Sequence, residues 1–205
     1  NFNVDTVSPV VAISAPANGA VTSDDTPTVS FTVTEDNPGT TECSLDGAAF
    51  SSCSSPFTTG SLADGAHSIA VRHTDVAGNE ATTTNNFTVD TTNPVVTISA
   101  PTESQVVNDT APSVAFGVVD ATATTTECSV DGGAFSSCSS PLTTGSLSEG
   151  AHSVDVRATD AAGNQGTTTR NFTVDSTLPS VSITSPADGA FLSDDTPSIS
   201  FTVTD

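Results

Sequence analysis

The stretch Asn86-Phe87-Thr88-Val89-Asp90-Thr91 decides the fold of this 205-residue chain, because it recurs twice with one residue changed each time. It appears as Asn1-Phe2-Asn3-Val4-Asp5-Thr6 at the start and as Asn171-Phe172-Thr173-Val174-Asp175-Ser176 further along. The two intervals are equal, since 86 − 1 and 171 − 86 both give a period of 85 residues. A repeat of that length lies within the usual size of an independently folding domain.

The period predicts the domain organisation. Residues 7–91 and 92–176 are expected to form two complete repeats. Residues 1–6 are expected to be the last strand of a preceding repeat, and residues 177–205 the start of a third, truncated repeat. A fragment as short as the last one cannot close a hydrophobic core by itself. We therefore expect the chain to be a window on a longer array.

Apolar and polar residues alternate within each repeat. Val29, Phe31 and Val33 alternate with Thr and Ser, a period of two that is typical of half-buried strands. Pairs such as Asp46-Gly47 separate these runs and favour tight turns. The expected strands of the first repeat are 10–15, 27–34, 41–46, 49–53, 57–61, 67–74 and 81–90. Seven short strands per repeat predict an all-β fold of tandem immunoglobulin-like β-sandwiches.

The charge of the chain excludes some classes of function. Asp and Glu number 24 against 3 Lys and Arg, which gives a formal net charge of −21. Such a chain repels phosphate backbones and anionic lipid headgroups, so no nucleic-acid partner is expected. Apolar runs are broken well before the roughly 20 residues that a membrane-spanning helix needs, so we expect no membrane insertion of this segment.

Four cysteines recur at the repeat period. Cys43 and Cys53 in the first repeat correspond to Cys128 and Cys138 in the second. Four cysteines allow three pairings, and the repetition favours Cys43–Cys53 and Cys128–Cys138. If the Asp46-Gly47 turn is a two-residue turn, Cys43 lies opposite Phe50, so this pairing needs a bulge or a wider loop. Free thiols are the alternative, and disulfides would place the chain in an oxidising, extracytoplasmic compartment.

Acidic residues are expected to gather at one pole of each sandwich. The loops after the second and sixth expected strands lie where the chain enters the domain, so their carboxylates should meet the linker. The expected ligands are Asp5, Glu35, Asp75 and Asn79 at one junction, and Asp90, Asp120, Asp160 and Asn164 at the next. Carboxylates this close repel one another unless a hard cation with six to eight oxygen ligands, such as Ca²⁺, lies between them. Turn formation and solubility are the alternative explanation of the same residues.

Other candidate sites are weaker. Asp24 and Asp25 are expected to lie with Asp64 at the opposite pole as a second acidic cluster. His67 and His152 have the strand parity of core residues, which favours packed structural imidazoles over catalytic bases. The chain has no Trp or Tyr for stacking on sugars and no Gly-x-Ser-x-Gly nucleophile motif, so we do not expect an enzyme.

Several motifs together resemble a known family. They are Glu42-Cys43-Ser44-Leu45-Asp46-Gly47, Leu62-Ala63-Asp64-Gly65-Ala66-His67, Thr74-Asp75-Val76-Ala77-Gly78-Asn79 and Phe87-Thr88-Val89-Asp90-Thr91. This set resembles a cysteine-containing variant of the bacterial immunoglobulin-like repeats of large secreted and surface-anchored adhesins. The resemblance covers essentially the whole chain. It implies an extracellular location, secreted or at the cell surface, and long stalks that are often stiffened by calcium at domain junctions.

The expected function is therefore a structural one. We expect a non-enzymatic stalk, extender or filament shaft whose partners are neighbouring repeats of the same chain, with self-assembly into a fibre as a further expectation. Proline at positions 9, 94 and 179 fixes the backbone next to each junction and favours a semi-rigid chain. The alternative is a glycan- or protein-binding accessory module of an adhesin or a secreted hydrolase.

Overall fold

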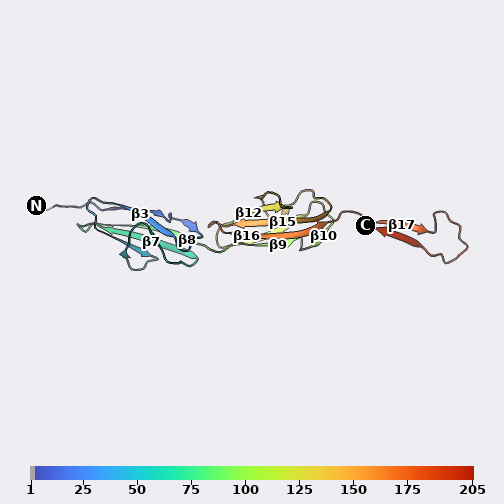
Figure 1. Cartoon of the computed structure of the whole chain (residues 1–205), viewed down its shortest axis with the longest axis horizontal. Coiled ribbons are helices and arrows are strands. Elements are labelled where there is room, and N and C mark those ends of the chain that lie inside the picture. Colours follow the sequence, from blue (N-terminus) through green and yellow to red (C-terminus); the bar gives the residue numbers. More distant parts are fainter. Residues whose placement is uncertain (1–2) are drawn as a thin grey trace. The chain divides into compact units, whose positions relative to one another are not determined.

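The fold is all-β. A computed structural model describes residues 3–205, and every regular element in that range is a β-strand (Figure 1). Within those residues, none belongs to a helix that is long and apolar enough to cross a membrane. The predicted fold class is thereby confirmed.

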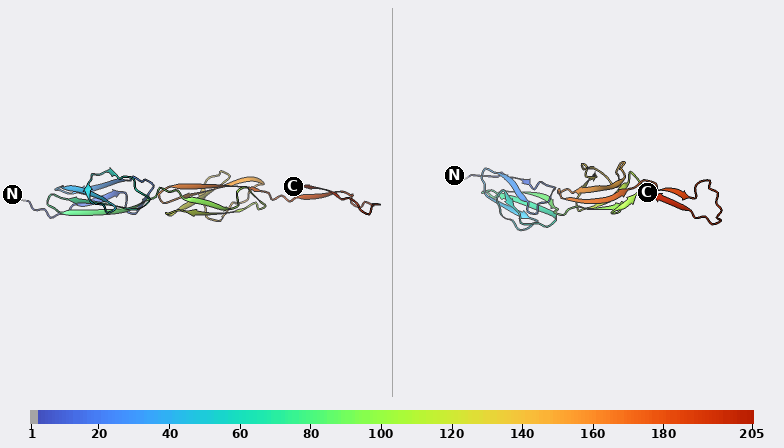
Figure 2. Two further views of the ribbon diagram at one scale, coloured as in Figure 1. Left: turned by 90° about the horizontal axis from the view of Figure 1, so that it is seen from below. Right: turned by 45° about the vertical axis from the view of Figure 1, so that its right-hand side comes forward.

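The first repeat forms two sheets. Its strands are β1 (Val10–Ala15), β2 (Ala20–Thr22), β3 (Thr28–Thr34), β4 (Thr40–Leu45), β5 (Ser51–Ser52), β6 (Phe57–Thr58), β7 (Gly65–Thr74) and β8 (Glu80–Val89). One sheet has the order β1-β3-β6 and the other the order β2-β8-β7-β4-β5. The strands can be followed from two further directions in Figure 2. All seven predicted strands are present, and β2 is an additional strand.

The same strand order recurs in the second repeat. Its strands are β9 (Val95–Ala100), β10 (Gln105–Val107), β11 (Ser113–Val119), β12 (Thr125–Val130), β13 (Ser136–Ser137), β14 (Leu142–Thr143), β15 (Gly150–Thr159) and β16 (Gln165–Val174). They form sheets of order β14-β11-β9 and β10-β16-β15-β12-β13. A two-stranded sheet of β17 (Ser180–Ser185) and β18 (Ser200–Thr204) follows.

The alternating residues of the first repeat form its core. Buried side chains from both sheets pack in one cluster: Val11, Val29, Phe31, Cys43, Ile69, Val71, Phe87 and Val89. Val29 and Ile69 are fully buried. Burial of each large apolar side chain contributes about 1.5 to 3 kcal/mol, so this cluster holds the two sheets together and fixes the loops at their ends.

β2, the strand that the sequence pattern did not predict, helps to position Asp90, one of the expected metal ligands. β2 pairs with β8 in parallel, with Ala20 opposite Phe87 and Thr22 opposite Val89. The ladder continues for one more bond, because the carbonyl of Thr22 accepts the backbone N–H of Asp90 at 2.9 Å. β2 has only three residues and all are partly buried, so it shows no alternation that a sequence pattern could detect.

Both disulfides join the cysteines whose pairing the repetition predicted. Cys43 bonds to Cys53, and Cys128 bonds to Cys138, each with a Cα–Cα distance of 5.8 Å. The hairpin does contain the tight turn, closed by a bond from the N–H of Ala48 to the carbonyl of Leu45. Cys43 nevertheless lies opposite Ser51, one residue beyond the position that a regular ladder gives. This irregularity between the turn and β5 brings Cys53 within reach of Cys43.

The contacts divide the chain into two compact units. The first runs to Thr97 and adds Gly117–Glu127 and Val156–Thr168. The second comprises Ile98–Phe116, Cys128–Asp155 and Thr169–Asp205. These limits do not follow the repeat, so the domain limits at 91/92 and 176/177 stay predictions. Of the strand expected at residues 1–6, residues 1–2 lie outside the described residues, and residues 3–6 belong to no strand.

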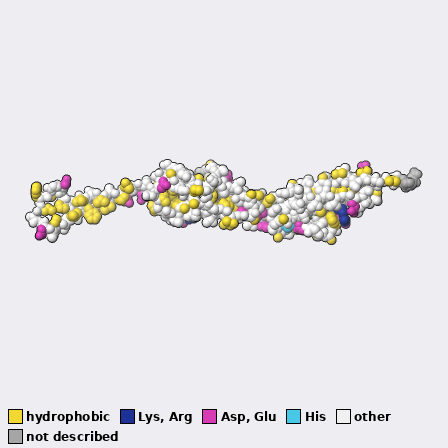
Figure 3. All heavy atoms as spheres, turned by 180° about the vertical axis from the view of Figure 1, so that it is seen from behind, with side chains coloured by type: hydrophobic (Ala, Val, Ile, Leu, Met, Phe, Trp, Pro, Cys, Tyr) yellow, Lys and Arg dark blue, Asp and Glu magenta, His cyan; other side chains and the backbone are white. Residues whose placement is uncertain are grey.

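The last hairpin leaves its apolar side chains exposed. Every residue of β17 and β18 is exposed, including Ile183 and Phe201, as the yellow spheres of the hairpin in Figure 3 illustrate. The equivalent residues Ile13 and Phe31 pack on the core cluster of the first repeat. A hairpin without an opposing sheet has nothing to bury them against.

Candidate metal centre

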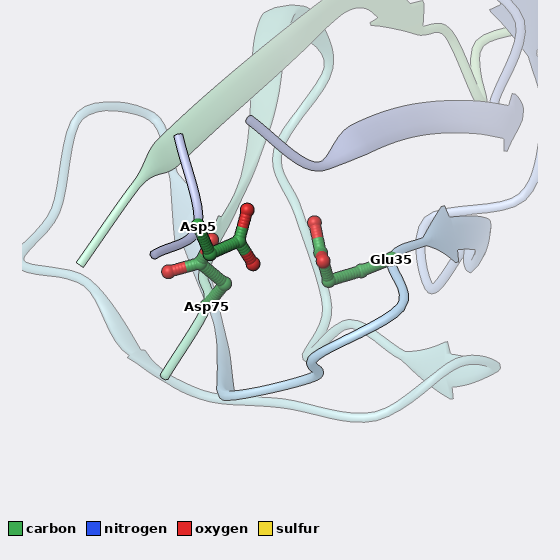
Figure 4. Close-up of side chains that lie close together, drawn as sticks. All are labelled: Asp5, Glu35 and Asp75. Carbon is green, nitrogen blue, oxygen red and sulfur yellow. The ribbon is translucent and has the colours of Figure 1, made fainter. Parts of the chain in front are cut away.

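The structure brings six of the eight predicted ligands into two groups of carboxylates. Asp5, Glu35 and Asp75 form the first group, and Asp90, Asp120 and Asp160 form the second. In each group one carboxylate oxygen from every residue lies within 4.8 Å of the others. Figure 4 shows the first group, in which the carboxylates of Asp5 and Glu35 are turned toward each other. Each group lies within the first compact unit.

The ends of strands position these side chains. Glu35 directly follows β3 and Asp75 directly follows β7. In the second group Asp90, Asp120 and Asp160 directly follow β8, β11 and β15. Because strands of the packed sheets end at these points, the sandwich core determines how close the carboxylates lie to one another.

A hydrogen-bonded loop fixes Asp75. Its Oδ1 accepts the backbone N–H groups of Ala77 and Asn79, each at 2.8 Å. Burial acts to raise the pKa of Asp75, but the hydrogen bonds from the side chain and backbone of Asn79 and from the N–H groups of Gly78 and Ala77 outweigh it and lower the pKa. Asp75 is therefore a carboxylate, the form that binds cations, at neutral pH.

The two asparagines act as hydrogen-bond donors in this structure. Asn79 Nδ2 donates to Asp75 Oδ2 at 2.8 Å and to the carbonyl of Asp5 at 3.2 Å. Asn164 Nδ2 donates to Asp160 Oδ2 and to the carbonyl of Asp90, each at 2.7 Å. Both asparagines lie beside their predicted group, but the amide nitrogen, rather than the oxygen that would bind a metal, faces the carboxylate. Each one joins the linker to the loop.

The two groups differ in the hydrogen-bond partners of their carboxylate oxygens. In the first group, Asp5 Oδ2 accepts a hydrogen bond from Asn37 Nδ2 at 2.9 Å. In the second group, Asp90 is only 3% exposed, and its Oδ2 has no hydrogen-bond partner within residues 3–205. A buried carboxylate oxygen without a partner is costly, and a bound cation would remove that cost.

The donor set fits Ca²⁺. Two oxygens bound to one Ca²⁺ at 2.3–2.6 Å lie at most about 5 Å apart, and the oxygens of each group satisfy this limit. Carboxylate oxygens are the ligands that Ca²⁺ prefers. The three arginines of the chain bind other carboxylates: Arg72 pairs with Glu42, Arg157 with Glu127 and Arg170 with Glu103.

Asp64 has a role that the sequence pattern did not indicate. It does not form a group with Asp24 and Asp25 that is close enough to share a cation; in the described part of the chain only the two groups above meet that condition. Instead, its carboxylate accepts hydrogen bonds from Thr91 N at 3.0 Å, Thr91 Oγ1 at 2.8 Å and Thr92 Oγ1 at 2.8 Å. These bonds, that from Thr92 first, lower the pKa of Asp64. One signal in the sequence could have indicated this role: the equivalent position of the second repeat is also acidic. That residue, Glu149, accepts the N–H of Ser176.

Two family models match the chain. Residues 14–91 match the bacterial Ig-like domain, and residues 142–205 match the bacterial Ig-like domain of group 3. No curated protein matches the chain in sequence.

Solved structures of other proteins are similar to the chain. The fibronectin(III)-like modules of CbhA from Clostridium thermocellum are 19% identical with a TM-score of 0.50, and the match covers 80% of this chain and 94% of that one. A tetra-tandem repeat from the extending region of a large adhesion protein is 18% identical with a TM-score of 0.41, over 96% of this chain and 62% of that one. The likeness to the CbhA modules, at 19% identity, shows the fold alone.

Proposed function

Residues 14–91 and 142–205 match bacterial Ig-like domains, and we propose that the chain is an extracellular, non-enzymatic spacer whose junctions between repeats are stiffened by Ca²⁺. Its partners are the neighbouring repeats of the same chain. The first group of carboxylates would hold one ion and the second group another. The two disulfides support an oxidising, extracellular location, where Ca²⁺ is also abundant.

The observation that carries this proposal is the buried, unpartnered Oδ2 of Asp90. Asp90 and Asp160 are 3% and 7% exposed, so two carboxyl groups are largely removed from water beside Asp120. Such an arrangement is unfavourable without a counter-ion. Turn formation alone explains Asp160, which binds its own loop, but it does not explain the Oδ2 of Asp90.

The position of Asp90 gives the ion a mechanical effect. Asp90 lies between β8 of the first repeat and β9 of the second, whereas Asp120 and Asp160 follow strands of the second repeat. An ion held by all three carboxylates would join the linker to the loops of the following repeat. Binding to the folded state alone also stabilises it, by about 2.7 kcal/mol when free Ca²⁺ is 100 times its dissociation constant.

Thermal unfolding with Ca²⁺ or with a chelator tests the metal. The wild-type chain should unfold at a higher temperature in Ca²⁺. Asp90→Asn should lose part of that increase. In the chelator it should unfold no earlier than wild type, because the Oδ2 that it replaces has no hydrogen-bond partner within residues 3–205. A variant that is less stable than wild type in Ca²⁺ but not in the chelator has lost a metal ligand, whereas a damaged fold would be less stable in both. Equal unfolding temperatures of the wild type in Ca²⁺ and in the chelator would reject the calcium sites.

Small-angle X-ray scattering tests the spacer. The largest dimension of the chain should be independent of protein concentration. When Ca²⁺ is added, the range of dimensions that the chain adopts should become narrower. A chain that is equally flexible in Ca²⁺ and chelator would contradict stiffening by the metal. Fibre assembly and the alternative of a glycan- or protein-binding module stay predictions.

A further inference from the structure

His67 and His152 occupy equivalent places in the two repeats. Each lies in the long strand β7 or β15, and their side chains are 12% and 8% exposed. The ring of His67 lies 5.7 Å from that of Phe87, and the ring of His152 lies 6.1 Å from that of Phe172. They are packed imidazoles, as the strand parity indicated, but their polar contacts give them a further property.

Both nitrogens of each ring face an oxygen. His67 Nδ1 lies 2.7 Å from Asp46 Oδ2, and Nε2 lies 2.8 Å from the carbonyl oxygen of Ala63. In the second repeat His152 Nδ1 lies 2.8 Å from Asp131 Oδ2, and Nε2 lies 2.9 Å from the carbonyl oxygen of Ser148. A neutral imidazole has one donor and one acceptor, so it can satisfy only one of these oxygens. The imidazolium, with two donors, satisfies both.

His73 shows the opposite arrangement. Its Nε2 accepts the N–H of Gly39 at 3.3 Å, and its Nδ1 lies 2.7 Å from the hydroxyl of Thr41, which is able to accept a hydrogen bond. A neutral ring therefore satisfies both contacts of His73. The two-acceptor geometry is specific to His67 and His152.

The two bonds of each ring connect segments on opposite sides of it. Asp46 belongs to the tight turn after β4, where Asp46 and Gly47 have positive φ angles of 52° and 74°. The second oxygen of Asp46, Oδ1, accepts the N–H of Ser68 at 2.8 Å. Ala63 lies in the loop that precedes β7 and is followed by Asp64, which binds the linker. The ring thus holds the turn and the loop together.

We propose that His67 and His152 are proton-operated latches that hold this turn and this loop together when the imidazole is protonated and release the loop when it is not. The latches are separate from the proposed calcium sites and do not depend on them. They make the mechanical stability of each repeat sensitive to pH close to neutrality, the range in which histidine titrates.

Among residues 3–205, each ring is paired with one carboxylate. Asp46 faces His67 and Asp131 faces His152, while the other packed groups are the neighbouring phenylalanine and the loop carbonyl. The shallow surface hollow beside His67 is otherwise lined by the uncharged Ala66, Ser68 and Asn86. The carbonyl of Ala63 and then Asp46 raise the pKa of His67 above 6.5. Asp131 and then the carbonyl of Ser148 raise the pKa of His152.

The direction of the pH effect follows from these raised values. The stabilisation is fully present below the pKa of histidine in the unfolded chain and is lost as the pH rises through the higher pKa of the folded chain. Metal binding has the opposite dependence, because protons compete for the carboxylates. In a chelator, the latches should therefore make each repeat more stable at pH 6 than at pH 8.

An NMR titration of the histidine rings tests the latches on the intact chain in chelator. The pKa values of His67 and His152 should both lie above 6.5. Asp46→Asn should lower the pKa of His67 and leave that of His152 unchanged, which makes the second repeat an internal control. Asparagine tolerates the positive φ angle at this position, so the turn should persist. A wild-type His67 pKa at or below 6.5, or one that Asp46→Asn leaves unchanged, would overturn the proposal.

A stability measurement tests the consequence. Chemical unfolding in chelator should show that the double variant His67→Gln, His152→Gln loses the decrease in stability that the wild type shows between pH 6 and pH 8. If the variant keeps the same pH dependence as wild type, the histidines are only packed side chains and the latch is rejected. Failure of the calcium proposal would not change either result, because both experiments are done without Ca²⁺.

Discussion

The side-chain amide of Asn164 donates a 2.7 Å hydrogen bond to the backbone carbonyl of Asp90, the residue with the buried, unpartnered carboxylate oxygen. The same amide nitrogen also donates to Asp160. One side chain therefore holds the linker to the loop after β15 without any metal. Since Asp64 binds Thr91 and Thr92 on the next residues of the linker, the segment from Asp90 to Thr92 is held at successive positions.

Asn164→Ala should weaken the linker even in chelator. The substitution removes two hydrogen bonds, one of them to a carboxylate, and leaves a carbonyl without this partner. We expect a loss of about 1 to 3 kcal/mol in the free energy of unfolding. Denaturant unfolding measures it, and Asn93→Ala, at an exposed linker position, is the matched control. Equal stability of the two variants would show that the bond to Asp90 contributes nothing.

Asp64→Ala should expose the linker backbone locally. Asp64 is the acceptor for the N–H of Thr91, so that amide should exchange its hydrogen faster in the variant. Asp25→Ala is the control, because Asp25 binds Ser61 instead. Hydrogen exchange followed by NMR reports on each amide. Unchanged protection at Thr91 in the Asp64 variant would contradict this role.

The second group of carboxylates should bind Ca²⁺ more tightly than the first. Asn37 already donates to Asp5, whereas Asp90 Oδ2 has no partner among residues 3–205, so the second group gains more from the ion. Glu35→Gln leaves the second group intact, and Asp120→Asn leaves the first. Calorimetric titration should give a lower dissociation constant for Ca²⁺ with Glu35→Gln, which keeps the second group, than with Asp120→Asn, which keeps the first. The reverse order would contradict the comparison.

Each disulfide should stabilise its repeat by a similar amount. A loop of about ten residues corresponds to roughly 2 to 3 kcal/mol in the chain-entropy treatment, although strain can reduce it. Replacing Cys43 and Cys53 by Ser should lower the free energy of unfolding by this amount, and replacing Cys128 and Cys138 should do the same. Denaturant unfolding under oxidising conditions measures both. A loss in only one pair would show that the repeats use their disulfides differently.

Acid should destabilise the chain through Asp75. Its pKa is lowered in the folded state, so its contribution is present above the pKa of an unfolded aspartate and is lost as the pH falls through the lower folded value. Asp75→Asn should therefore reduce the loss of stability on the acid side. Unfolding in chelator between neutral pH and pH 3 measures this loss. An acid dependence identical to that of wild type would contradict the assignment.

The repeat and the alternation of apolar residues were sufficient to predict the sandwiches. Val29, Phe31, Ile69 and Val71 follow the period of two that the core requires, and all four are buried. The disulfide pairs followed from the recurrence of cysteine at the same period. β2 was not predicted because its three residues are all partly buried and show no alternation of buried and exposed positions.

The proximity of the carboxylates was predictable, but their hydrogen bonds were not. Glu35 and Asp75 follow strands that end at the same pole, so strand order alone placed them together. The orientation of the Asn79 amide depends on side-chain torsion angles, which spacing does not encode. Asp64 was assigned to an acidic group because its charge was visible in the sequence, whereas its acceptor role toward Thr91 depends on the path of the linker.

The stoichiometry of Ca²⁺ binding tests the central claim most directly. Equilibrium dialysis of the intact chain should find one ion for each group of carboxylates, and Asp90→Asn should abolish binding at the second group only. Asp36→Asn is the control, because Asp36 lies beside Glu35 but outside the first group. Loss of one ion in Asp90→Asn, with none lost in Asp36→Asn, is the predicted result. A chain that binds no Ca²⁺ at millimolar concentration would contradict a metal-stiffened spacer.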